Sequence, residues 1–213
     1  MALCLVGSEM CIRDRAHDLL NNASLILDNE DCMFSYRDSI FKNELKGRTL
    51  IHEVTFKLTK NNHIINASYG GILDHLDSKN ISHPTIQDIA QAVVEIRQAK
   101  LPDPNKIGNA GSFFKNPLIP KAQFDKLKEN YPDIPGYEVA QTDNIKVPAG
   151  WLIDRAGWKG KTHGKVGVYK NQALVLVNHG EGNGQEILSL SSAIMEDIDN
   201  QYGIELEREV NIV

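Results

Sequence analysis

Apolar side chains recur every three or four residues in two long stretches of the chain, and this is the period of a helix with one buried face. The first stretch predicts a helix over 83–100 and the second a helix over 185–202. Their apolar stripes consist of Ile86, Ile89, Val93 and Ile96, and of Ile187, Leu190, Ile194 and Ile198. Shorter helices are predicted over 121–130 and 148–157, the second ending at Gly157 because glycine often ends a helix.

Strand patterns lie before, between and after these helices. Apolar runs predict strands over 23–27, 50–58, 64–67, 173–177 and 204–213. We expect 50–58 and 64–67 to pair as a hairpin through Asn61 and Asn62. The segment 173–177 is apolar throughout, which predicts a strand buried on both faces.

The last predicted strand carries Glu205, Glu207 and Glu209 on one face, a pattern typical of a solvated edge. Helices and strands follow one another in mixed order without a detectable repeat. The fold class is therefore predicted to be α+β.

The segment 101–104 (Leu-Pro-Asp-Pro) ends the helix over 83–100, since each proline lacks a donor and disfavours helical geometry just before it. We place the domain boundary there. The predicted domains are residues 16–100 and 101–202, followed by the strand over 203–213.

Residues 1–15 do not resemble the start of a domain, and the fold is predicted without them. Their apolar run is too short for a signal peptide and has no basic residue ahead of it. The end of the segment, 10–15, resembles translated adaptor sequence found at the ends of metagenomic gene predictions. We expect a non-native leader on an N-terminally truncated fragment, with the gene beginning further upstream.

Composition narrows the class of protein. The 213 residues have an ordinary apolar fraction of 41% and a formal charge of −5, which argues against a nucleic-acid binder. No stretch is long and apolar enough to cross a bilayer. Three cysteines without paired spacing fit a reducing cytoplasm, and the histidines lack the spacing of a metal site.

The glycine-rich segment 108–117 (Gly-Asn-Ala-Gly-Ser-Phe-Phe-Lys-Asn-Pro) is the strongest candidate site. Glycine has no side chain to hold a ligand away from the backbone. If 112–116 is a strand, Ser112 and Asn116 share one face and could meet a polar ligand. A glycine-rich turn into a buried strand is the alternative.

Three other residues carry suitable chemistry. Arg37 offers a planar fork of donors for a carboxylate, although it also suits a surface pair with Asp38. Tyr69 suits either a ligand platform or the core. Lys100 suits either a phosphate contact or a helix-end lysine.

Six ordered motifs resemble one family, the UDP-N-acetylenolpyruvoylglucosamine reductases of peptidoglycan precursor synthesis. These motifs lie at 36–42, 100–104, 108–117, 149–154, 172–178 and 206–210. The resemblance spans essentially everything after Arg15. It implies the C-terminal half of an FAD-binding domain of the PCMH (vanillyl-alcohol-oxidase) type, then an α+β substrate-binding domain, then a strand over 203–213 that returns to the flavin region.

The resemblance also implies a cytoplasmic, monomeric oxidoreductase that reduces UDP-N-acetylglucosamine enolpyruvate with FAD as cofactor and NADPH as reductant. Ser112 would donate the proton that quenches the substrate carbon, while Arg37 and Glu209 would stabilise the intermediate. Residues implied to hold the UDP portion are Tyr69, Lys100 and Asn116.

Two departures weaken the cofactor site. The family's glycine-containing flavin-phosphate segment is absent, and Asn211 stands where some members carry arginine. We therefore expect this fragment to bind FAD poorly and to turn over little substrate, and the full gene product to be active. A non-enzymatic UDP-sugar-binding module is the alternative function.

Overall fold

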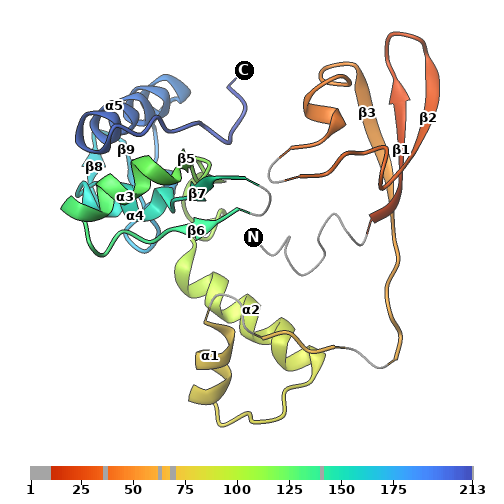
Figure 1. Ribbon diagram of the computed structural model, residues 1–213, viewed down its shortest axis with the longest axis horizontal. Helices are drawn as coiled ribbons and strands as arrows, with labels where there is room; N and C mark the ends of the chain where they lie inside the picture. Colours follow the sequence, from red (N-terminus) through yellow and green to blue (C-terminus); the bar gives the residue numbers. More distant parts are fainter. Residues whose placement is uncertain (1–10, 36–37, 62–63, 68–70, 140–141, 213) are drawn as a thin grey trace. The chain divides into compact units, whose positions relative to one another are not determined.

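The computed structural model describes residues 11–35, 38–61, 64–67, 71–139 and 142–212 of the chain (Figure 1). The chain divides into two compact units, Met1–Val93 and Val94–Val213. The division falls within helix α2, which spans Ile86–Lys100, rather than at the predicted boundary after it.

The first unit contains a three-stranded antiparallel sheet in the order β2-β1-β3. Its strands are β1 (Cys11–Asp18), β2 (Ala23–Asp28) and β3 (Thr49–Phe56). The strands predicted over 23–27 and 50–58 are thus confirmed. The central strand was missed, because five of its residues lie in the segment 1–15 that was set aside from the fold.

The predicted hairpin is wrong. Residues 64–67 form no strand, and β3 pairs instead with β1, from Cys11↔Phe56 to Asp18↔Thr49. β3 is therefore an edge strand of this sheet, and its pairing with β1 bonds one side of its backbone. A 3-10 turn, Ile40–Lys42, and helix α1, Ile72–Ser78, which was not predicted, precede α2. The helix predicted over 83–100 is confirmed, although α2 begins three residues later, at Ile86.

One buried carboxylate joins two parts of the first unit. Asp18 is 1% exposed and accepts bonds from Arg48, with Nη2 to Oδ2 at 2.6 Å and Nε to Oδ1 at 3.1 Å. The backbone N–H of Leu20 and the side chain of Asn21 donate to the same carboxylate. The Arg48 bonds, reinforced by these donors, hold the pKa of Asp18 well below its usual range.

We expect the first unit to lose stability in acid because of this carboxylate. A depressed pKa adds stability that is present above the unfolded value of about 3.9 and is lost as the pH falls through the folded value. Asp18→Asn should lower the unfolding temperature at neutral pH and flatten its fall in acid. Asp28→Asn, which alters an exposed carboxylate 3.6 Å from Arg13, is the matched control. Thermal unfolding that depends equally on pH in both variants would contradict this expectation.

The second unit combines two small sheets with three helices. The four-stranded sheet has the order β4-β10-β9-β8, and the three-stranded sheet has the order β5-β7-β6. Their strands are β4 (Gly108–Ser112), β5 (Leu118–Pro120), β6 (Tyr137–Glu138), β7 (Asn144–Lys146), β8 (Thr162–His163), β9 (Val166–Val168) and β10 (Val175–Asn178). The helices are α3 (Lys121–Asn130), α4 (Ala149–Arg155) and α5 (Gly184–Tyr202). All three were predicted, and the mixed content agrees with the α+β class.

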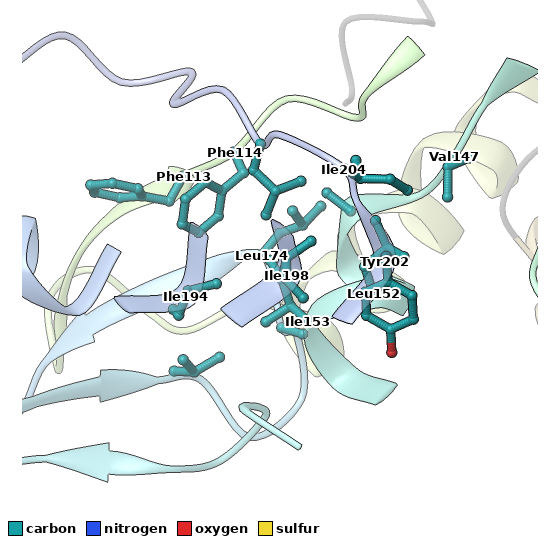
Figure 2. Close-up of a cluster of buried hydrophobic side chains, with 14 of the residues drawn as sticks. Phe113, Phe114, Val147, Leu152, Ile153, Leu174, Ile194, Ile198, Tyr202 and Ile204 are labelled. Atoms are coloured by element: carbon teal, nitrogen blue, oxygen red, sulfur yellow. The ribbon is translucent and has the colours of Figure 1, made fainter. Parts of the chain in front are cut away.

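Helix α5 supplies much of the core. Its capping box, Asn183 with Glu186, fixes the start of the helix, and Gly203 ends it at φ +61°, a left-handed conformation that glycine adopts without strain. Ile194 and Ile198, from the predicted stripe, are fully buried with the side chains shown in Figure 2. The strand predicted over 173–177 is confirmed as buried on both faces, although β10 itself starts at Val175.

Candidate functional site

The glycine-rich segment forms β4, an edge strand that pairs with β10 through Ser112↔Val175 and Asn109↔Val177. Between these two pairs β4 contains one residue more than β10, so the strand bulges just before Ser112. Gly111 sits in the bulge at φ +72°, where other residues are strained, and its N–H donates to Asn109 Oδ1 at 3.1 Å. Bulges redirect the next side chain, and this one sets the half-buried Ser112 at the end of the strand.

The condition for a shared face of Ser112 and Asn116, a strand over 112–116, is not met. β4 ends at Ser112, and both Phe113 and Phe114 are buried, at 3% and 1% exposure, so their side chains do not alternate between core and solvent. Their rings meet edge to face with centroids 5.4 Å apart. Packing two consecutive rings into the core breaks the two-residue period, and the shared face expected for Ser112 and Asn116 therefore does not exist.

Asn116 is half-buried and has a structural partner. Its Oδ1 accepts the backbone N–H of Ala149, the first residue of α4, at 3.0 Å. Because only the carbonyl oxygen can accept that hydrogen, the side-chain amide is fixed in orientation. Its Nδ2 has no protein partner among the described residues, so it is available to donate to an acceptor on a ligand.

The last part of the chain returns to the glycine-rich segment. Lys115 N–H donates to the carbonyl of Glu207 at 2.9 Å, and Glu209 N–H donates to the carbonyl of Phe113 at 2.8 Å. These bonds place the backbone of Glu209 beside the residue that follows Ser112. Two of the three predicted catalytic residues therefore lie together in one unit, although they are 97 positions apart in the sequence.

The strand predicted over 204–213 is only partly right. In the described part of that range, 204–212, pairing is limited to an isolated bridge between Arg208 and Phe114. Side chains alternate at its start, with Ile204 and Leu206 buried and Glu205 exposed. Glu209 is half-buried, so it does not belong to the fully solvated row that the sequence pattern suggested.

Lys100 is the last residue of α2 and is exposed. The carbonyl of the preceding residue, Ala99, accepts a bond from Asn171 Nδ2 at 3.1 Å. This contact fixes the end of α2 to the loop before β10. Lys100 therefore belongs to the second unit, with Ser112, Asn116 and Glu209.

Arg37 and Tyr69 lie outside the described residues, and their predicted roles stay predictions. Arg208 was not among the predicted site residues. Its guanidinium binds the hydroxyls of Ser191 and Ser192 on α5. A serine within the apolar stripe of a predicted helix was the available signal, because a buried hydroxyl needs a partner.

The surroundings of Ser112 fit a flat ligand. Gly108, Ala110 and Gly111 on the edge strand are exposed, so only small atoms separate solvent from the backbone. A planar ring such as a flavin can approach such a strand closely. Over the described ranges there is no cluster of three or more His, Cys, Asp or Glu side chains able to hold a metal ion, and no helix suited to spanning a membrane.

Comparison with known proteins gives one family. The model of the UDP-N-acetylenolpyruvoylglucosamine reductase C-terminal domain matches residues 103–213. The curated reductase of that name from Flavobacterium johnsoniae is 53% identical over 185 residues, which is 87% of this chain and 55% of the relative. The reductase from Bdellovibrio bacteriovorus is 46% identical over 194 residues, which is 91% of this chain and 56% of the relative. The chain thus spans about half the length of these relatives.

A solved structure has the same fold. The crystal structure of UDP-N-acetylenolpyruvylglucosamine reductase from Thermus caldophilus matches with a TM-score of 0.56 at 19% sequence identity. The match covers 96% of this chain and 53% of the other. At that identity the likeness speaks for the fold alone.

Proposed function

This chain belongs to the UDP-N-acetylenolpyruvoylglucosamine reductase C-terminal domain family, and we propose that its protein reduces the enolpyruvyl ether of UDP-N-acetylglucosamine to UDP-N-acetylmuramate. The relatives that carry this name support the reaction. The single observation that supports it is the bond from Glu209 N–H to the carbonyl of Phe113, because it holds the backbone of Glu209 next to the residue that follows Ser112.

FAD, when bound and reduced by NADPH, supplies a hydride to the terminal vinyl carbon of the substrate. Hydride addition leaves an enolate conjugated with the substrate carboxylate. Ser112 gives its hydroxyl proton to the adjacent carbon, which bears the carboxylate. This transfer is chemically possible because the enolate is more basic than the serine alkoxide, and because the hydroxyl is held in place and is reprotonated by solvent. Glu209 and Arg37 stabilise the charge that develops.

The UDP portion of the substrate needs donors and an aromatic surface. Asn116 meets this need with an amide whose oxygen is already bonded to Ala149, which leaves its NH₂ to donate to an acceptor oxygen of the substrate. Lys100 adds a positive charge suited to a diphosphate. Tyr69 completes the proposed substrate site as an aromatic platform.

The domain assignment follows the same proposal. Residues 16–100 form part of an FAD-binding domain of the PCMH type, 101–202 form the substrate domain, and 203–213 return to the flavin. The family match that begins at residue 103 supports the boundary at 101. The proposed place of action is the cytoplasm, as a monomer in peptidoglycan synthesis.

The test is to purify the 213-residue chain and the complete gene product, and to measure bound flavin and substrate-dependent NADPH oxidation. The complete protein should oxidise NADPH only when the enolpyruvyl substrate is present and should form a product two hydrogen atoms heavier. Calorimetric binding of the UDP-sugar without NADPH oxidation in a flavin-loaded protein would instead favour a UDP-sugar-binding module.

A further inference from the structure

Arg208 lies on the inward side of the segment that follows α5. Ile204 and Leu206 are buried, at 1% and 3% exposure, and the two-residue period puts Arg208 on the same side. Its guanidinium binds α5, with Nε 2.8 Å from Ser191 Oγ and Nη2 2.7 Å from Ser192 Oγ. The next residue, Glu209, then faces the opposite side.

The two serine hydroxyls are themselves held in place. Each donates to the carbonyl of Leu188, at 2.8 Å from Ser191 and 3.0 Å from Ser192. Since the hydroxyl hydrogens are used in this way, both oxygens present lone pairs to Arg208. Ser191 is fully buried within the apolar stripe of α5, where a serine is tolerated because both sides of its hydroxyl are satisfied.

The charge of Arg208 is not used for an ion pair. No carboxylate lies within ion-pair distance of its guanidinium in the part of the chain that the structure describes, and its partners are two neutral oxygens on adjacent residues. A planar fork with two donors in fixed geometry suits this arrangement, whereas a lysine ammonium would not hold both oxygens in one geometry. The contact therefore serves to fix position.

We propose that Arg208 is a positioning residue that fixes Glu209 beside Ser112 through its bonds to Ser191 and Ser192. The segment is fixed on its other side by Lys115 N–H to the carbonyl of Glu207 and by Glu209 N–H to the carbonyl of Phe113. The buried side chain of Leu206 and the ion pair of Lys115 with Glu207 also hold the segment, so loss of the Arg208 contact should loosen the backbone around Glu209 without detaching the segment. The catalytic consequence rests on the proposed function, whereas the structural consequence does not.

The structural consequence is measured by amide hydrogen exchange on the 213-residue chain. In Arg208→Lys, and in the double variant Ser191→Ala with Ser192→Ala, the amides of Lys115 and Glu209 should exchange about tenfold faster. Amides of β9 and β10 should stay within about twofold of the parent. Ser192→Thr keeps the hydroxyl that binds Arg208 and should leave the exchange of both amides at the parent rate. Arg155→Lys, at an exposed arginine 3.7 Å from Asp133, is the matched control.

The catalytic consequence is measured in the NADPH-oxidation assay on the flavin-loaded complete protein. Arg208→Lys should lower kcat about tenfold and leave KM within about twofold, because the substrate contacts are intact while the carboxylate is displaced. Unchanged exchange at Glu209, or faster exchange spread evenly over the second unit, would overturn the proposal. So would an unchanged kcat in an active enzyme. If the parent protein shows no turnover, the proposed function fails, and the exchange measurement alone decides the role of Arg208.

Discussion

Ser112→Ala is expected to lower kcat by about 10²- to 10⁴-fold with little change in KM, which is the range that a positioned proton donor contributes to catalysis. The hydroxyl stands at the end of β4, directly after a bulge, and is half-buried. Alanine removes the proton donor and leaves the backbone pairing with Val175 intact. The loss should therefore appear in the chemical step rather than in binding or folding.

The measurement separates the two halves of the reaction. Stopped-flow mixing with NADPH alone should show reduction of the flavin at the parent rate, whereas subsequent mixing with the enolpyruvyl substrate should show slow reoxidation. Ser78→Ala, which removes an exposed serine hydroxyl in α1, is the matched control and should leave both rates unchanged. A variant of Ser112 that reoxidises at the parent rate would remove this residue from the mechanism.

Local periodicity was enough to predict helices α2, α3, α4 and α5 and the buried strand, although it missed the short helix α1. The stripe of α5 and the proline break after Lys100 depend only on nearby residues, and the structure confirms both. The predicted hairpin after β3 failed for the opposite reason. Its true partner, β1, lies more than 30 residues earlier, and part of it was discarded with the leader. Strand pairing is a non-local choice that periodicity does not encode.

The candidate site also depends on non-local contacts that periodicity does not encode. A two-residue period over 112–116 was a reasonable expectation, but the core receives Phe113 and Phe114 together. Two backbone bonds, from Lys115 N–H to Glu207 and from Glu209 N–H to Phe113, hold the segment after α5 next to the residues that follow Ser112. Backbone bonds leave no mark in the sequence, so only the resemblance to a family could connect these two residues. The contact of Arg208 with α5 had one weak local signal in the sequence, Ser191 within an apolar stripe, and the contact was not predicted.

Asn116→Asp is expected to weaken binding of UDP by about 10- to 100-fold, which is the range for loss of a hydrogen bond to a charged group. Aspartate keeps the oxygen that accepts the N–H of Ala149, and a negative charge at the start of α4 is favourable. It replaces the NH₂ donor by a carboxylate that repels a diphosphate. The variant should thus be stably folded and defective in binding.

Asn116→Ala supplies the complementary comparison. It removes the cap as well as the donor, and should lower the free energy of unfolding by about 1 kcal/mol while losing less affinity than the aspartate variant, since it adds no repulsion. Calorimetric titration with UDP and thermal unfolding of both variants measure the two effects separately. If aspartate binds UDP as tightly as the parent, the amide of Asn116 serves only to cap α4, and the proposed substrate site loses one of its three contacts.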